Sequence, residues 1–302
     1  MNILVFSDPH GRIALIYRII YEFQKNKNFD VDLVLVTGDL GIFPDINKMD
    51  KMSLKFALKD ASEFGFSRYF EPIISGYTPF KEIGQTESVF MEKILPAIKC
   101  KIIFVGGNHE DYEYLKLCIN NQDVIVPVEK RKKLWYLQNN YIYDFNGLRI
   151  CGISGLDKNK CNPKKHNPMA LIDDNKIRNF IDSVFNYKPH ILLTHDGLNN
   201  PSQIPDNSSC FLSVIQNINP VYHFFGHYHW AIEVINYSEK YLELKKTRTR
   251  GVLLNETNFD SQGNLKKNCI GFLQWENEDN NSFTYINDDW LKNITKYGWD
   301  KL

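Results

Sequence analysis

Residues 3–10 read ILVFSDPH, an apolar run that stops at an acidic residue and a histidine. Short, near-continuous apolar runs are typical of strands that are buried on both faces. Residues 13–20 follow with helical periodicity, and a second apolar run occupies residues 33–36. This order of strand, loop, helix and strand predicts a βαβ unit and therefore a parallel sheet.

The pattern of an apolar run with a polar end recurs along the chain. Further runs occupy residues 102–105, 191–193 and 223–225, and residues 148–153 predict another strand that is entered through a turn at residues 146–147. Five polar motifs accompany these runs: Asp8-Pro9-His10, Gly38-Asp39, Gly107-Asn108-His109-Glu110, Thr194-His195-Asp196 and Gly226-His227-Tyr228-His229. If the strands lie side by side in parallel, the motifs converge on one edge, where open α/β sheets form their sites.

Together the motifs supply several carboxylates, one amide and five imidazoles, enough to hold two metal ions with one histidine to spare. Asp8 and His10 are two residues apart, so in an extended segment their side chains point the same way. Asp39 is the natural bridge, because a carboxylate has two oxygens. A set of nitrogen and oxygen ligands without thiolate suits Mn, Fe, Zn, Co or Ni better than Ca, and we expect Mn to support activity best.

Two metal ions held in one site indicate a particular class of reaction. Two ions about 3.5–4 Å apart suit phosphoryl transfer, because they make hydroxide available from a bridging water and stabilise negative charge on the phosphate. His109 is adjacent to the ligand candidate Asn108 but is not needed as a ligand. It is therefore the candidate that protonates or stabilises the leaving oxygen. Glu110 and Asp196 either orient neighbouring groups or are simply solvated.

Composition limits the class of protein. The 302 residues are 43% hydrophobic and 24% charged, and 36 basic residues balance 36 acidic ones. The overall charge therefore gives no sign of a nucleic-acid or membrane partner. It does not exclude a local basic patch. Six cysteines without a close CxxC pair favour reduced thiols, and the first apolar run is too short for a signal peptide or membrane span. We expect a cytoplasmic protein without membrane association.

We expect residues 1–302 to form a single domain. Residues 41–100 are a long insertion between two strand-end motifs, and either cover the site or form a passive loop. Helices are expected over residues 50–65, 86–98 and 171–186. Residues 231–302 are expected to be a strand-rich C-terminal extension of the same core.

Other residues allow two interpretations. The basic runs at residues 130–133 and 245–250 are most simply solvated, but Arg12, Arg248 and Arg250 are weak candidates for binding the substrate phosphate. Aromatic side chains of the insertion could stack on a base or pack in the core; these are Tyr69, Phe70, Tyr77 and Phe80. Three histidines match no motif and are expected to be structural or surface residues; these are His166, His190 and His223.

The order D-x-H, G-D, G-N-H-E, H and G-H-x-H resembles that of the calcineurin-like metallophosphoesterase superfamily over roughly residues 1–230. This resemblance implies an α/β fold, namely a four-layer α-β-β-α sandwich with two mixed β-sheets flanked by helices, and a binuclear metal site. One metal would be held by Asp8, His10, Asp39 and His229, and the other by Asp39, Asn108, His195 and His227. His109 would be the catalytic proton donor.

A narrower resemblance concerns residues 69–77, 104–110 and 147–155, which look like segments of the RNA lariat debranching enzymes and their prokaryotic relatives. Those enzymes cut a 2′–5′ phosphodiester. The eukaryotic ones characteristically have Cys where this chain has Asp8, which counts against true debranching. The resemblance therefore favours a phosphodiesterase that acts on a nucleotide or nucleic acid, without naming the bond.

Two other functions compete with this interpretation. The first is a phosphomonoesterase, either a nucleotide or a protein phosphatase. A protein phosphatase of this superfamily would be expected to have arginines beside the metal motifs, whereas Asp39 is followed by Leu40 and Glu110 by Asp111. The second is a non-catalytic scaffold, whose expected signature is the loss of ligands, but the complete set is present.

Overall fold

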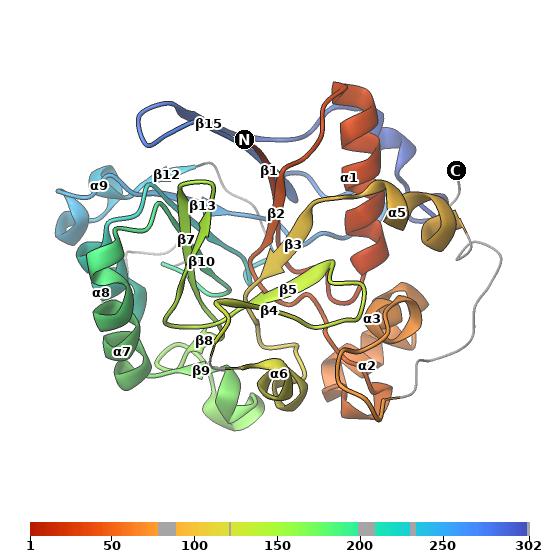
Figure 1. The fold of residues 1–302 in the computed structure, drawn as a ribbon, viewed down its shortest axis with the longest axis horizontal. Coiled ribbons are helices and arrows are strands. Elements are labelled where there is room, and N and C mark those ends of the chain that lie inside the picture. Colours follow the sequence, from red (N-terminus) through yellow and green to blue (C-terminus); the bar gives the residue numbers. More distant parts are fainter. Residues whose placement is uncertain (78–88, 121, 199–208, 230–233, 301–302) are drawn as a thin grey trace.

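The computed structural model describes residues 1–77, 89–120, 122–198, 209–229 and 234–300. In these residues, two large mixed sheets pack face to face, and helices cover the outer face of each (Figure 1). This arrangement confirms the four-layer α-β-β-α sandwich expected from the sequence.

The first sheet has the order β15-β14-β1-β2-β3-β5-β4. β1, β2, β3 and β5 are parallel, whereas β14, β15 and β4 pair antiparallel with their neighbours. The strand bounds are β1 Asn2–Phe6, β2 Leu33–Val36, β3 Lys101–Phe104, β4 Ile125–Pro127, β5 Leu134–Leu137, β14 Ile270–Trp275 and β15 Asn281–Tyr285.

The second sheet has the order β12-β13-β11-β10-β7-β6. β7, β10, β11 and β13 are parallel, and the two edge strands are antiparallel. The bounds are β6 Ile142–Phe145, β7 Leu148–Ile153, β10 Ile191–Thr194, β11 Tyr222–Phe225, β12 Ile235–Asn236 and β13 Arg250–Leu253, with a separate short pair of β8 Leu156–Asp157 and β9 Leu171–Ile172.

β1 shows why the central strand sequences are almost entirely apolar. Ile3 and Val5 belong to the core layer between the two sheets, whereas Leu4 and Phe6 belong to the layer beneath α1 (Ile13–Lys27). Successive side chains of a strand point to opposite faces, so a strand with both faces covered has no polar position.

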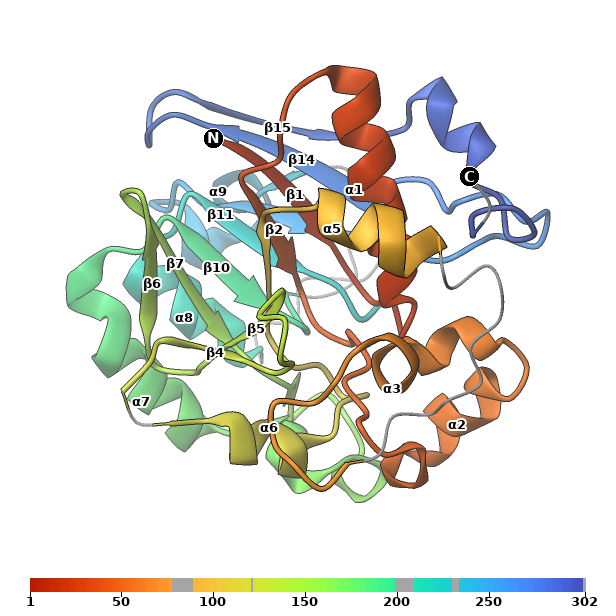
Figure 2. The same ribbon diagram turned by 45° about the vertical axis from the view of Figure 1, so that its right-hand side comes forward.

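The helices divide between the two outer layers. In Figures 1 and 2, α1 and α5 lie on the first sheet, whereas α7 and α8 lie on the second. The remaining bounds are α2 Lys51–Ala57, α3 Gly65–Tyr69, α5 Leu95–Ala97, α6 Tyr112–Cys118, α7 Asp174–Val184, α8 Cys210–Ile218 and α9 Tyr237–Lys240. Across the described ranges, none of the helices is long and apolar enough to cross a membrane.

The predicted helices differ from the observed ones mainly at their boundaries. The segment at residues 50–65 divides into α2 and a 3₁₀ helix at Ala61–Phe64. At residues 86–98, a π-helix at Phe90–Ile94 precedes α5, and residues 86–88 lie outside the described residues. α7 starts after Asp173, whose side chain caps the helix, because the preceding residues pair as β9.

The C-terminal part of the chain contributes strands to both sheets. β12 and β13 extend the second sheet, whereas β14 and β15 extend the first sheet beside β1 (Figure 2). Residues 231–233 and 301–302 of the expected extension lie outside the described residues. The last strand pair therefore completes the sheet that the first strand of the chain begins.

Candidate metal centre

The five polar motifs follow β1, β2, β3, β10 and β11 at their carboxyl ends. The sequence-based expectation of one row of strands is wrong in one respect, because β1–β3 belong to one sheet and β10 and β11 to the other. The motifs nevertheless meet where the two sheets adjoin. The backbone N–H of His227 donates to Oδ2 of Asp8 (2.9 Å) and so connects the loops of the two sheets.

Five of the predicted ligands have a left-handed backbone conformation. Their φ angles are 48° for Asp8, 47° for His10, 49° for Asp39, 70° for His227 and 53° for His229. The extended segment expected at Asp8 and His10 is therefore wrong. Backbone turns bring these two side chains within 4.0 Å of each other instead. A left-handed residue other than glycine costs roughly 1–2 kcal/mol, and such strain is concentrated at functional sites.

One cluster of ligand atoms consists of Asp8, His10 and His229, whose ligand atoms all lie within 4.8 Å of one another. Nε2 of His229 is 3.3 Å from Oδ1 of Asp8 and 3.2 Å from Nε2 of His10. Oδ1 of Asp8 is buried and has no hydrogen-bond partner among the described residues. A buried carboxylate oxygen beside two imidazole nitrogens is an arrangement that a bound cation satisfies.

A second cluster surrounds His195. Its Nε2 lies 3.3 Å from Oδ2 of Asp39 and 3.2 Å from Oδ1 of Asn108, and its ring centroid is 5.1 Å from that of His227. Oδ2 of Asp39 is also 3.8 Å from Nδ1 of His10. Asp39 therefore lies between the two clusters, where a bridging ligand is required.

The charges of the centre need compensation. Asp8, Asp39 and His195 are almost completely buried. Burial by itself lowers the pKa of His195, but the charges of Asp39 and Asp8 outweigh it and raise that pKa to about 10. Burial lowers the pKa of His10 to about 4 despite the same two carboxylates. The buried carboxylates thus favour positively charged groups at the centre. The nitrogen and oxygen donors suit divalent transition-metal ions.

Two glycines allow the loops to approach these carboxylates. A Cβ atom on Gly226 would lie 2.2 Å from Oδ2 of Asp8, and one on Gly107 would lie 2.0 Å from Oδ1 of Asp39. Both distances are far below van der Waals contact. The glycines that open two of the motifs are therefore required by packing around the ligands.

His109 lies at the edge of the centre, and residues of the 41–100 insertion orient it. Its Nδ1 is 2.8 Å from Oδ2 of Asp50 and 3.0 Å from Oγ of Ser53, while its backbone N–H donates to Oδ1 of Asp39 (2.7 Å). It also forms a possible ligand cluster with His10 and Asp39. Burial alone would lower the pKa of His109, but Asp39 and then Asp50 raise it to about 9.

Sequence reasoning missed Asp50 and Ser53. Asp50 opens a predicted helix, and its side chain does cap α2, so a local role could have been found. Its contact with His109 joins residues 59 positions apart, and no local pattern signals it.

Two acidic residues of the motifs hold neighbouring loops. Both oxygens of Glu110 accept backbone N–H groups, from Leu40 (2.7 Å) and Ile42 (2.7 Å), directly after Asp39. Oδ1 of Asp196 accepts the hydroxyl of Tyr228 (2.6 Å), the residue between two predicted ligands. These contacts fix the loops that carry the ligands.

Glu256 is a further residue that the sequence did not indicate. Its Oε2 lies 3.8 Å from Nδ1 of His229, and its other oxygen pairs with Lys266. Metal-binding histidines commonly have a carboxylate at their second nitrogen, which fixes the orientation of the ring. Glu256 lies between β13 and β14, far along the chain from every motif.

A cavity of about 450 Å³ opens beside the clusters. Its described lining residues are His10, Arg12, Met52, Ser53, Phe56, Glu63, His109, His229, Glu256 and Asn258. Arg12 therefore borders the centre, but its Nη2 already pairs with Glu63 (2.6 Å) and Asp60 (3.1 Å). Its Nε and Nη1 are buried and have no hydrogen-bond partner among the described residues.

The structure does not bring Arg248 and Arg250 to the metal centre, so they are no longer candidates for binding a phosphate there. Arg250 starts β13, at the amino end of a strand whose parallel neighbour β11 leads to the metal motifs at its carboxyl end. Its guanidinium lies 4.3 Å from the ring centroid of Tyr222. Arg248 forms an ion pair with Glu278.

Of the aromatic residues singled out in the insertion, the three that the structure describes do not line this cavity. Phe70 is buried in the core, and Tyr77 packs against Tyr114 with a centroid distance of 5.3 Å. Tyr69 packs against Phe90 (4.8 Å). Phe80 lies outside the described residues. Core packing thus accounts for Phe70, and the other two described rings contact core aromatics.

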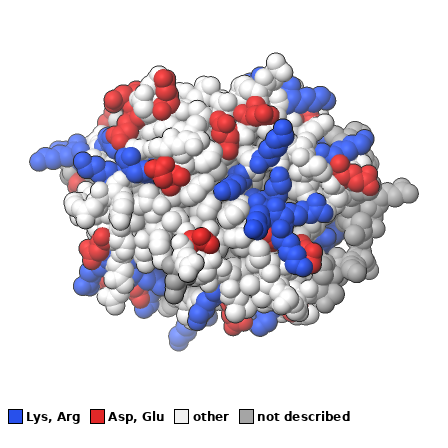
Figure 3. All heavy atoms as spheres, in the orientation of Figure 1, with Lys and Arg blue, Asp and Glu red and all other residues white. Residues whose placement is uncertain are grey.

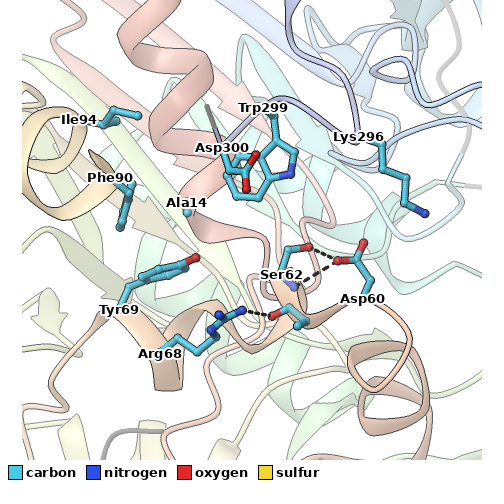
Figure 4. Close-up of a pocket in the computed structure, with 11 residues that line it drawn as sticks. Ala14, Asp60, Ser62, Arg68, Tyr69, Phe90, Ile94, Lys296, Trp299 and Asp300 are labelled. Atoms are coloured by element: carbon cyan, nitrogen blue, oxygen red, sulfur yellow. Dashed lines mark hydrogen bonds between the residues drawn. The ribbon is translucent and has the colours of Figure 1, made fainter. Parts of the chain in front are cut away.

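Tyr69 also borders a second cavity, of about 240 Å³, which contains none of the predicted ligands (Figure 4). Polar groups of this cavity bond to neighbouring protein atoms: Ser62 donates to Asp60 (2.6 Å), and Arg68 donates to the carbonyl of Ala61 (3.0 Å). The cavity beside the metal clusters is therefore the candidate for substrate binding.

The family model for calcineurin-like phosphoesterases matches residues 1–231, and the chain belongs to this family. Membership supports a phosphoester hydrolase that uses a dinuclear metal centre.

Curated relatives are lariat debranching enzymes. That of Drosophila pseudoobscura pseudoobscura is 27% identical over 158 residues, which cover 52% of this chain and 24% of that enzyme. That of Entamoeba histolytica is 23% identical over 203 residues, which cover 67% of this chain and 47% of that enzyme. The chain thus matches about a quarter to a half of the length of these relatives. A solved structure, TT1561 of Thermus thermophilus, is 13% identical and covers 84% of this chain and 89% of that chain, with a TM-score of 0.48.

Proposed function

We propose that the protein is a binuclear metal-dependent phosphodiesterase that acts on a nucleotide or nucleic acid. The observation that carries this proposal is the convergence of two ligand clusters on Asp39, beside a cavity that also contains His109. Asp8, His10, Asp39 and His229 would hold one ion, and Asp39, Asn108, His195 and His227 the other. Divalent ions supply Lewis-acid stabilisation of the phosphate and acidify the attacking water.

His109 would supply the proton that the leaving oxygen needs. Asp50 and Ser53 both bond to Nδ1, so Nε2 is the ring nitrogen that remains for the substrate. The carboxylate of Asp50 beside Nδ1 favours the protonated form of the imidazole, which is the form that acts as an acid. Arg12, oriented through Nη2 by Glu63 and Asp60, would line the substrate cavity, and its Nε and Nη1 have no partner among the described residues.

The charges around the cavity favour a diester over a monoester. A phosphodiester carries one negative charge, whereas a monoester carries close to two at neutral pH. Two carboxylates, Glu63 and Glu256, line the cavity, and its arginine is already paired. Arg12 is the one arginine or lysine among the described lining residues, so the single charge of a diester is easier to balance there than the two charges of a monoester.

The nucleotide part of the proposal is supported by the similarity to lariat debranching enzymes. Figure 3 shows Lys and Arg side chains gathered on the face over β3 and β5. Lys130, Arg131 and Lys132 are exposed at the turn before β5, and Nζ of Lys101 lies 4.6 Å from the ring centroid of Trp135. These side chains lie at the amino ends of β3 and β5, opposite the carboxyl ends that lead to the metal motifs, so they do not bear on binding in the cavity.

The proposal is tested with the manganese-loaded protein. Elemental analysis should find close to two ions per chain, and bis(4-nitrophenyl) phosphate should be hydrolysed faster than 4-nitrophenyl phosphate. Dinucleotides, cyclic nucleotides, single strands and branched RNA then define the substrate. His109→Ala should keep its metal and lose most turnover on a dinucleotide. A chain that binds no ion after loading, or that prefers the monoester, would contradict the proposal.

A further inference from the structure

α2 has an apolar face that is turned away from the core. Ala57 is its only residue buried in the protein, whereas the side chains of Met52 and Phe56 are 50% and 46% exposed. Residues four apart lie on the same side of a helix, so Met52 and Phe56 form one continuous surface. This surface lines the cavity that contains His10, His109 and His229.

The position of this surface relative to the metal centre is fixed. Asp50, at the start of α2, bonds to His109, and Ser53 on the first turn contacts the same imidazole. Phe56 is six residues after Asp50, which is about 9 Å along a helix axis. The ring therefore lies within the reach of a group attached to a phosphate at the metal clusters.

We propose that Phe56, with Met52 beside it, is the stacking platform for the nucleobase next to the scissile phosphate. This inference rests on the proposed function and adds the element that recognises the substrate. Every nucleobase has a flat π-face that stacks on an aromatic ring, so such a platform binds bases with little sequence preference. The polar residues Glu63, Glu256 and Asn258 line the same cavity and can meet the hydrogen-bonding edge of the base.

A solitary exposed apolar side chain is common on protein surfaces and needs no explanation. Leu58, at the end of α2, is such a residue: it is 74% exposed and does not line the cavity. Met52 and Phe56 differ because they lie together and border the predicted ligands. Leu58 is therefore the matched control, as a large apolar residue of the same helix that cannot touch the substrate.

Binding is measured first, by calorimetry on the manganese-loaded protein. The probes are an adenosine 5′-phosphonate, in which a methylene group replaces the ester oxygen, and the same ribose phosphonate without its base. The native protein should bind the nucleoside compound more tightly. Phe56→Ala should weaken that binding by about 5- to 150-fold, the range expected for one stacked base, and should leave the ribose compound unchanged. Phe56→Trp should retain the preference, and Leu58→Ala should match the native protein.

Hydrolysis of a dinucleotide and of its abasic analogue gives the second test. Phe56→Ala should lower kcat/KM for the dinucleotide by a similar factor and should not change it for the abasic substrate. If the native protein binds both phosphonates equally, or if Phe56→Ala affects both equally, the stacking platform is refuted. If base-dependent binding is present but no diester is hydrolysed, the proposed activity fails and the nucleobase site stands.

Discussion

Replacing Asp50 with asparagine would separate two roles of its carboxylate. Oδ1 accepts the backbone N–H groups of Met52 (2.9 Å) and Ser53 (3.0 Å) at the start of α2, whereas Oδ2 bonds to His109. Asparagine caps helices about as well as aspartate. Asp50→Asn therefore keeps the helix start and removes the negative charge beside the imidazole.

The size of the effect follows from this contact. A hydrogen bond to a charged group stabilises by about 1.5–3 kcal/mol. The side chain of Asp50 is 38% exposed, so solvent screens the pair and about 1.5–2 kcal/mol is the appropriate part of that range. If protonated His109 assists departure of the leaving oxygen, kcat on a dinucleotide should fall by about 10- to 30-fold. KM should change by less than about threefold, because the interaction acts in the transition state.

The pH profile should shift in a defined direction. The charge of Asp50 helps to raise the pKa of His109, so its removal lowers that pKa. Activity that requires the protonated imidazole is lost as the pH rises through this pKa. The alkaline decline of kcat should therefore begin at a lower pH in Asp50→Asn than in the native protein.

The choice of substrate makes the assay diagnostic. A dinucleotide expels a basic alkoxide that needs a proton, whereas 4-nitrophenolate is a weak base that leaves with little assistance. Asp50→Asn should therefore slow the dinucleotide but change bis(4-nitrophenyl) phosphate hydrolysis by less than about threefold. Lys55→Ala, at an exposed position of α2 outside the cavity lining, is the control. Equal losses on both substrates, or no loss on the dinucleotide at native metal content, would refute this role of Asp50.

Three further predictions concern the stability of the centre and of its surroundings. Burial lowers the pKa of His223 to about 3 from its ordinary 6.5, so the unfolded chain takes up a proton first and the free energy of unfolding falls as the pH drops below 6.5. Between pH 7 and 5 the native protein should lose about 2 kcal/mol more in free energy of unfolding than His223→Gln. An equal loss in both proteins would contradict this. Gly226→Ala should displace Asp8, which reduces the metal content and destabilises the fold by about 1–3 kcal/mol. Gly298→Ala, whose Cβ would meet only a hydroxyl at 3.3 Å, should keep the native metal content and stability. Retention of two ions by Gly226→Ala would count against the site. Manganese at 100 times its Kd should stabilise the chelator-treated protein by about 2.7 kcal/mol, and identical unfolding curves with and without the ion would argue against a metal centre.

The central strands could be predicted because their sequences are constrained on both faces. β2 and β7 have the bounds that their apolar runs indicated, because nearly all their side chains are buried; the exception is Arg149, near the start of β7. β14 and β15 could not be placed in the same way. β14 pairs with β1, which lies more than 260 residues away in the chain, and nothing local in the sequence encodes that pairing; β15 then pairs with β14.

The candidate metal ligands could be named from the sequence, but the residues that surround them could not. The ligand candidates could be recognised because their motifs directly follow the apolar runs of the strands. Asp50, Phe56 and Glu256 come from a helix of the insertion and from a loop near the C-terminus, and only tertiary packing brings them to the cavity. Single residues outside motifs have no pattern by which a sequence can identify them.

The backbone of the ligands explains why so large a core surrounds so small a centre. Five left-handed residues at roughly 1–2 kcal/mol each cost about 5–10 kcal/mol, which is comparable with the whole net stability of a typical domain. The buried carboxylates of Asp8 and Asp39 add a further electrostatic cost. Relaxed loops would separate the ligand atoms, so the two sheets must hold the strained loops in place from both sides. Cations bound at these carboxylates would offset the remaining charge and would couple the stability of the fold to occupancy of the site.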